Sequence, residues 1–100
     1  MVILTFDPQA GHEQKGRRPA LVVSNYKFNK AVGFALVCLI TNTNRDFPFH
    51  VQVEAEQIVG YILTEQVKSI DYEARTMKFV EALDENSLDD VMGIIGAILA

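Results

Sequence analysis

The chain has 100 residues, of which 49% are hydrophobic and 22% are charged, and its net charge at pH 7 is −4. This length and composition are ordinary for one globular domain, which we place at residues 1–100. Cys38 is the single cysteine, which excludes an internal disulfide and is typical of a small buried core residue. No signal peptide is visible and the longest apolar stretch, Val91–Ala100, is too short to span a bilayer. We therefore expect a cytoplasmic protein that makes no use of a membrane.

The hydrophobic pattern predicts a series of short strands followed by one helix. The predicted strands are Met1–Phe6, Ala20–Ser24, Gly33–Ile40, His50–Glu54, Tyr61–Thr64, Gln66–Tyr72 and Met77–Ala82. The polar segment Asn25–Ala31 is expected to be a turn or short loop. The fold class is therefore mostly β with a C-terminal helix, in the form of a small twisted barrel.

Helical spacing replaces the strand pattern near the end of the chain, where apolar residues recur from Leu88 to Leu99. Asp84 or Ser87 is expected to cap this helix, and Ser87-x-x-Asp90 resembles a capping box. Gly93 and Gly96 fall on a second face of small residues, which indicates close approach by another backbone.

The negative net charge argues mildly against a nucleic-acid ligand, but the charges are unevenly distributed. Gln9–Lys30 holds five basic residues against Glu13 alone, a local balance of +4, whereas Asp71–Ala100 has a balance of −5. A local basic patch can bind RNA even when the whole chain is acidic.

The stretch Asp7–Ser24 contains a long polar loop between two β-type runs. Loops of this length inside a compact domain are uncommon and are often functional. Six side chains that can donate hydrogen bonds, accept them or neutralise an anion lie within seven residues: His12, Glu13, Gln14, Lys15, Arg17 and Arg18.

The residue patterns of several common enzymes are absent. No His or Cys neighbours stand at metal-ligand spacing around the two histidines, so we expect no metal and no cofactor. Neither a phosphate-binding P-loop nor a motif around a nucleophilic serine is present.

RNA, in contrast, supplies its own nucleophile, the 2′-OH. Its cleavage needs an acid, a base and donors for a charged phosphorane. From residue types alone, His12 is the acid/base candidate, Glu13 its partner and Arg18 the phosphate clamp, because an arginine fork matches phosphate oxygens.

The pattern D-P-x-x-G-x-E-Q-x-G-x-R-P at Asp7–Pro19, followed by a β run, resembles the opening of the MazF/PemK family. These are toxins of bacterial type II toxin–antitoxin pairs that act as sequence-specific endoribonucleases. The segment T-E-Q-V-K-S-I-D at Thr64–Asp71 is similar to a second stretch shared by the family. Family members usually start the first strand with R-G-D-(I/V). Here Met1 stands about where that Asp would be, so the first strand is expected to be shortened.

The resemblance implies an SH3-like barrel of the CcdB/MazF type and assigns roles to individual residues. The catalytic residues are expected to be Arg18, which stabilises charge and can protonate the leaving oxygen, Thr41, which holds the phosphate, and Glu13. His12 becomes a contact residue, and the general base stays open. The other expected RNA contacts are Gln14, Lys15, Arg17, Asn42 and Gln66, and the loops Gln9–Arg17 and Asn42–Pro48 are expected to shape the RNA groove.

The resemblance also implies the ligands and partners. It predicts a metal-independent mRNA interferase that cuts single-stranded RNA to 2′,3′-cyclic phosphate and 5′-OH ends. The partners are a second copy of the chain in a homodimer and a MazE-like antitoxin, whose acidic, partly disordered tail blocks the RNA groove. DNA binding is expected only through the antitoxin complex. The alternatives are a non-catalytic CcdB-like toxin that poisons a protein such as gyrase, and a plain structural β-barrel module. Neither alternative requires Arg18 and Thr41 together.

Overall fold

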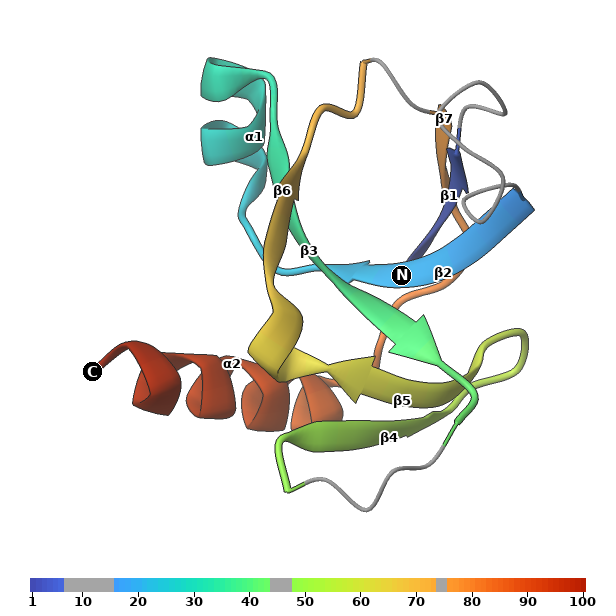
Figure 1. Ribbon diagram of the computed structural model, residues 1–100, viewed down its shortest axis with the longest axis vertical. Coiled ribbons are helices and arrows are strands. Elements are labelled where there is room, and N and C mark those ends of the chain that lie inside the picture. Colours follow the sequence, from blue (N-terminus) through green and yellow to red (C-terminus); the bar gives the residue numbers. More distant parts are fainter. Residues whose placement is uncertain (7–15, 44–47, 74–75) are drawn as a thin grey trace.

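The computed structural model describes residues 1–6, 16–43, 48–73 and 76–100. Within these ranges the chain forms a seven-stranded antiparallel sheet, two α-helices and one short 3₁₀ helix (Figure 1). The elements in chain order are β1 (Val2–Phe6), β2 (Gly16–Val22), α1 (Tyr26–Val32), β3 (Ala35–Thr41), β4 (His50–Glu54), β5 (Val59–Leu63), η2 (Thr64–Gln66), β6 (Lys68–Ile70), β7 (Thr76–Phe79) and α2 (Glu85–Leu99). None of the helices in the described ranges has the length and hydropathy that a bilayer crossing requires. The expected class, mostly β with a C-terminal helix, is confirmed.

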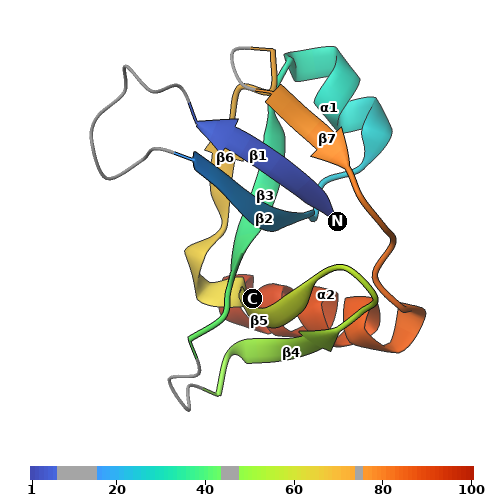
Figure 2. The same ribbon diagram turned by 90° about the vertical axis from the view of Figure 1, so that its right-hand side faces the viewer.

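Strand β3 joins the two parts of the sheet. The strand order is β4-β5-β3-β2-β1-β7, and β6 pairs with the first half of β3 while β5 pairs with its end. The sheet is strongly curled, so that β6 and β7 lie on opposite sides of one barrel-like space (Figure 1), and β4 and β5 extend beyond it (Figure 2). This arrangement is a small, partly open barrel.

The curl produces two apolar cores, one on each face of the central strands. The first lies between β3, β5, β4 and α2, and its buried residues are Met1, Leu21, Cys38, Ile40, Val53, Ile58, Ile62 and Val91. The second lies inside the curl, and its buried residues are Val2, Leu4, Ala20, Ala35, Val37 and Ile70. Cys38 is a buried core residue, as predicted, and burial raises the pKa of its thiol to about 11. The thiol is therefore neutral and has a packing role.

Helix α2 covers β4 and β5 through the fully buried Val91. Asp84 caps the helix, because its Oδ2 accepts a hydrogen bond of 3.0 Å from the backbone N–H of Ser87. The expected cap at Asp84 is therefore confirmed. The alternative cap at Ser87, with the capping box Ser87-x-x-Asp90, is wrong. Within the described part of the chain, no heavy atom outside the helix's own backbone comes within 4 Å of a Cβ built on Gly93 or Gly96. The partner backbone expected against this face therefore does not belong to the described residues.

The segment predicted as a turn, Asn25–Ala31, is instead the short helix α1. Asn25 caps its start by accepting a hydrogen bond of 2.9 Å from the N–H of Phe28, and Gly33 ends it in the left-handed conformation with φ of 78°. The prediction failed because α1 buries none of its residues, so its sequence carries no apolar helical period. Caps at both ends specify it instead.

Several strand boundaries also differ from the predictions, most clearly those of β2, β6 and β7. Strand β2 begins at Gly16 rather than Ala20, so Arg17 and Arg18 belong to a strand and not to a loop. Strand β6 contains only Lys68–Ile70, because Gln66 belongs to the 3₁₀ turn η2. Strand β7 ends at Phe79 rather than Ala82. The predictions placed these boundaries where the hydrophobic pattern starts or ends. In the structure, pairing with a neighbouring strand decides where each strand starts and ends.

The cap of α2 makes a testable contribution to stability. The Ser87 hydrogen bond lowers the pKa of Asp84, so the carboxylate stabilises the fold above its ordinary pKa and loses this effect as the pH falls through the lowered value. We expect Asp84→Ala to lower the thermal midpoint at pH 7 by a few degrees, and Asp84→Asn to retain most of the midpoint because asparagine caps equally well. Thermal unfolding followed by circular dichroism measures both. Asp89→Ala, at an exposed position inside α2, is the control, and an equal loss in Asp89→Ala would contradict the capping role.

Candidate functional site

Pairing with β1 determines the directions of the two adjacent arginines on β2. Arg17 stands opposite Thr5, and Arg18 stands opposite Leu4. Neighbouring residues on a strand point to opposite faces, so Arg18 shares the face of the second core and Arg17 the face of the first. Both arginines are exposed. The pair therefore carries positive charge to both sides of one strand end.

Thr41 is the last residue of β3, the strand that follows β2 in the sheet. Its Oγ1 accepts a hydrogen bond of 3.2 Å from the N–H of Thr43. A hydroxyl that accepts one hydrogen bond still has its own proton to donate. Thr41 is half-buried and Asn42 beyond it is exposed. The end of β3 therefore presents a fixed hydroxyl donor to any group that lies beside it.

A second polar group forms where β5 passes into η2. The Nε2 atom of His50 lies 3.2 Å from Oε2 of Glu65, and the side-chain amide of Gln66 donates to the same oxygen at 3.2 Å. Burial opposes ionisation of Glu65, but hydrogen bonds from its own backbone, from His50 and from Gln66 outweigh it and lower the pKa of the carboxyl. Glu65 is therefore an anion at neutral pH. Its other oxygen, Oε1, is buried without a donor among the described residues.

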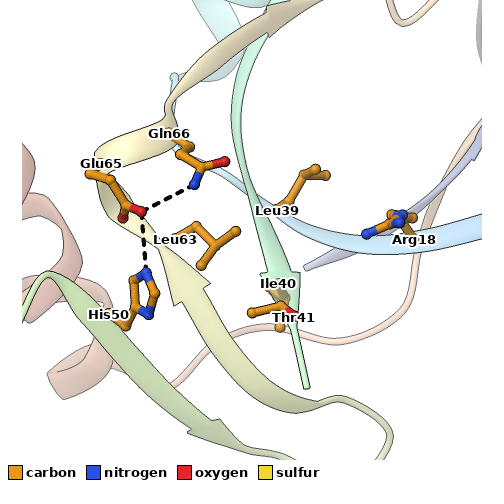
Figure 3. Close-up of a pocket in the computed structure, with 8 residues that line it drawn as sticks. All are labelled: Arg18, Leu39, Ile40, Thr41, His50, Leu63, Glu65 and Gln66. Atoms are coloured by element: carbon orange, nitrogen blue, oxygen red, sulfur yellow. Dashed lines mark hydrogen bonds and ion pairs between the residues drawn. The ribbon is translucent and has the colours of Figure 1, made fainter. Parts of the chain in front are cut away.

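One cavity of about 440 Å³ connects the two polar groups. It is lined by Arg18, Leu39, Ile40, Thr41, His50, Leu63, Glu65 and Gln66. Figure 3 shows Arg18 on one side, the His50–Glu65–Gln66 group on the other, and Thr41 between them at the end of β3. The cavity therefore offers cationic and hydroxyl donors on one side, and a carboxylate and an amide on the other. These groups could bind a ligand that has an anionic group next to a ring or an amide that forms hydrogen bonds.

The structure brings together three of the predicted site residues in this cavity: Arg18, Thr41 and Gln66. Arg17 and Asn42 line an adjoining cavity of about 380 Å³ that shares Arg18 and Thr41 with the first. The remaining predicted residues are His12, Glu13, Gln14 and Lys15, which lie outside the described residues and stay predictions.

The contributions of His50 and Glu65 were not predicted from the sequence. His50 was expected only in connection with a metal site, and Gln66 was expected to contact RNA without its neighbour Glu65. Glu65 adjoins Gln66 in the segment T-E-Q-V-K-S-I-D, which is the one sequence signal that points to it. Nothing in the sequence brings His50 to Glu65, since fifteen residues separate them and only the pairing of β4 with β5 brings them together.

Metal ligands do not gather in this region. In the ranges that the structure describes, no group of three or more His, Cys, Asp or Glu side chains could hold a metal ion.

The fold and the site define a class of small, mostly antiparallel β proteins with a C-terminal helix. A crystal structure of MazF from Deinococcus radiodurans has this fold, with a TM-score of 0.82, 36% identity, and 98% of this chain and 90% of that chain covered. A MazE–MazF complex from the same organism gives a TM-score of 0.87 and 36% identity, with 98% of this chain and 89% of that chain covered.

The chain belongs to the family of PemK-like, MazF-like toxins of type II toxin–antitoxin systems, whose model matches residues 1–99. It is 37% identical over 75 residues to the Endoribonuclease toxin MazF of Escherichia coli strain K12, covering 75% of this chain and 68% of the relative. The family resemblance found in the sequence is therefore confirmed.

Gly60 on β5 is the close neighbour of Thr41. A Cβ built on Gly60 would lie 2.5 Å from the carbonyl oxygen of Thr41 and 3.0 Å from Cγ2 of Ile40. Real Cβ atoms do not approach backbone oxygens this closely, so any larger residue must push β3 away. Glycine here lets β5 lie against the end of β3 and hold Thr41 at the cavity.

We therefore expect Gly60→Ala to lower the rate of RNA cleavage, by up to about 10²-fold, the cost that a displacement of 1 Å can carry. Single-turnover cleavage of a long RNA, together with thermal unfolding, measures the effect on rate and on fold. Ser69→Ala is the control, because Ser69 is exposed on β6 and lines neither cavity of the site. Full activity in Gly60→Ala would contradict the positioning of Thr41 by this contact.

Proposed function

We propose that this toxin is an endoribonuclease that cuts single-stranded RNA with Arg18 and Thr41 at the scissile phosphate. The observation that carries the proposal is the position of both side chains in one cavity. The name of the Escherichia coli relative, an endoribonuclease toxin, supports the same reaction. The products are a 2′,3′-cyclic phosphate and a 5′-OH end, because the nucleophile is the 2′-OH of the RNA.

Arg18 and Thr41 supply donors for the charge that develops on the phosphorus centre. The exposed guanidinium of Arg18 can bind two phosphate oxygens at once, and its charge stabilises the dianionic phosphorane. Thr41 can donate its hydroxyl proton to a phosphate oxygen. The oxygen of this hydroxyl already accepts a hydrogen bond from the N–H of Thr43, so the proton remains for the ligand. Arg18 can also protonate the 5′-oxygen as that group leaves. The proton of the 2′-OH needs a base, for which Glu13 is the family candidate.

The other side of the cavity suits recognition of a nucleobase. Gln66 donates one amide proton to Glu65, which leaves its carbonyl oxygen and second proton for a base edge. The anionic Glu65 is an acceptor for an exocyclic amine. Reading of bases in single-stranded RNA commonly uses such edge contacts. Asn42 and Arg17 extend the contact surface along the neighbouring cavity.

The proposed partner is a MazE-like antitoxin, as in the MazE–MazF complex from Deinococcus radiodurans. An acidic antitoxin tail competes with RNA for the field of Arg17 and Arg18, since both ligands are polyanions. The cytoplasm is the proposed compartment because the RNA substrate is there. A non-catalytic CcdB-like mode of action is not favoured, since the curated relatives are named endoribonucleases.

A homodimer is the proposed assembly, formed through an apolar groove beside α2. The groove has a volume of about 510 Å³, and its apolar lining is Val23, Leu36, Val67, Met92, Ile95, Ile98 and Leu99. Leu99 is 79% exposed, and large exposed apolar patches mark interfaces. The open faces of Gly93 and Gly96 on the same helix allow another backbone to approach.

The position of Glu65 supports a second copy of the chain as the occupant of this groove. Its side chain lines both the apolar groove and the cavity of Arg18 and Thr41. A copy seated in the groove would therefore border the RNA site, and two-fold symmetry would bring two such sites to one interface.

The catalytic assignment predicts the effect of Arg18→Ala. We expect cleavage of a long single-stranded RNA, assayed in excess EDTA, to fall by about 10²–10³-fold, the usual cost of removing one transition-state donor. The thermal midpoint is expected to stay unchanged because Arg18 is exposed. Arg18→Lys keeps the charge but loses the fork, so it is expected to restore only part of the activity.

Lys68→Ala is the matched control for this experiment, since Lys68 is also exposed on a strand but lines neither cavity of the site. Activity of Arg18→Ala at the level of Lys68→Ala would remove Arg18 from the mechanism. Loss of all cleavage in EDTA, restored by magnesium, would indicate a different class of nuclease.

The dimer proposal predicts that Ile98→Asp converts the protein to a monomer, because it places a charge in the apolar groove. Size-exclusion chromatography with light scattering at micromolar concentration measures the mass. The control is Val59→Asp, which changes an exposed apolar residue outside the groove and is expected to leave the dimer intact. A monomeric wild-type protein, or a dimeric Ile98→Asp, would show that the groove is not the interface.

A further inference from the structure

We propose that the bound RNA continues past Arg17 into a further binding site between β1, β7 and the turn that joins β4 to β5. This site would hold the sugar–phosphate backbone of nucleotides that flank the cut. The inference rests on the proposed RNA cleavage, and it adds Lys78 and Gln57 to the residues that contact the substrate.

The site is a cavity of about 270 Å³ on the face of the sheet opposite to Arg18. Its lining includes Ile3, Arg17, Gln57, Ile58, Lys78 and Phe79. The lining combines two cations and one amide. These groups can bind the phosphates of a single-stranded polyanion.

Shared residues connect this flanking cavity to the cleavage site. Arg18 and Thr41 line both the cleavage cavity and the adjoining cavity. Arg17 lines both the adjoining cavity and the flanking cavity. The three hollows therefore follow one another around the end of β2. A strand whose phosphate binds Arg18 can leave the cleavage site along this route without crossing an apolar core.

Strand register places Arg17 and Lys78 on the same face of the sheet. Arg17 is opposite Thr5 on β1, and Lys78 is opposite Ile3 on the other side of the same strand. Thr5 and Ile3 are two residues apart, so they point to one face and their partners point with them. Two strand spacings and two residues separate the Cα atoms of the two cations, a distance of about 12 Å. Long side chains at this separation can contact different phosphates of one strand.

Neither cation is neutralised by a carboxylate that the structure describes. Arg17 and Lys78 are exposed, and the described ranges contain no ion pair that includes either of them. Glu81 is the acid that lies next to the flanking cavity, and its carboxylate accepts hydrogen bonds of 2.8 and 2.9 Å from the N–H groups of Gln57 and Ile58. Glu81 therefore holds the turn that forms one wall, and the positive charge of the two cations stays available to a ligand.

The connection to the cleavage site favours RNA over an acidic peptide as the ligand. An acidic peptide would be attracted by the local positive charge alone. An RNA bound at Arg18 must also continue beyond the cleavage site, in one direction or the other.

The test compares two RNAs that contain the same cut site. A site is first mapped in a long transcript cut by the wild-type protein, and both RNAs carry a 2′-deoxynucleotide at the attacking position so that they bind but are not cleaved. The short RNA ends next to the cut on both sides, and the long RNA adds about eight nucleotides on each side, a length within the usual site size of single-strand binders. Fluorescence anisotropy over a salt series gives the affinity and its salt slope.

We expect Lys78→Gln to weaken binding of the long RNA several-fold and to reduce its salt slope by about 0.7, the value for one phosphate contact on a single strand. Binding of the short RNA is expected to stay unchanged. Phe79→Ala is expected to leave binding of both RNAs unchanged, because Phe79 adjoins Lys78 on β7 and its side chain points to the opposite face. Lys68→Gln is the matched control, since it removes an exposed lysine that lines none of the three cavities.

An equal effect of Lys78→Gln on both RNAs, or no effect on either, would overturn the proposal. Unchanged RNA binding with a weakened antitoxin complex would also overturn it and assign the flanking cavity to the protein partner. Failure of the proposed function is separate, because it would be seen as a wild-type protein that cuts no RNA in the Arg18 assay.

Discussion

The antiparallel pairing of β2 with β1 is the constraint on which the site depends. Leu4 stands opposite Arg18 and is fully buried in the core inside the curl. With Leu4 kept in the core, a slip of one residue in this register would turn Arg18 to the opposite face of the sheet. The free energy of burying a leucine, about 1.5–3 kcal/mol, therefore also fixes the direction of Arg18, the arginine proposed to bind the phosphate. The stability of the core and the geometry of the site are set by the same hydrogen-bonded ladder.

The turn at the end of β5 makes the second contribution. Gly60 lets β5 approach the carbonyl of Thr41, and Thr64 at the end of the same strand donates a hydrogen bond to the carbonyl of Phe49, next to His50. Glu65 follows, and it borders the cleavage cavity on one side and the apolar groove on the other. One short segment thus holds the threonine and presents a carboxylate. In the proposed dimer the same segment also lies between the RNA site and the interface, so the two sites are neighbours.

Much of this could be predicted from the sequence, for identifiable reasons. Strands with one buried face, such as His50–Glu54, show clear alternation, and α2 shows helical spacing. Arg18 and Thr41 followed from a specific family pattern. Helix α1 was missed because caps specify it and no residue of it is buried, and the strand character of Arg17 was missed because pairing with β1 extends β2 beyond its apolar run. The contact of His50 with Glu65 depends on the register of two strands, which no local pattern records.

The central claim is that Arg18 and Thr41 act together on one phosphate, and a double-mutant cycle tests it most directly. Single-turnover cleavage rates are measured for the wild type, Arg18→Ala, Thr41→Ala and the double variant, with thermal unfolding as a check on the fold. Residues that stabilise the same transition state show strongly non-additive effects. We expect the double variant to cleave RNA about as slowly as the slower single variant. Rate losses that multiply in the double variant would show that the two residues act at separate steps and would contradict a single site at the ends of β2 and β3.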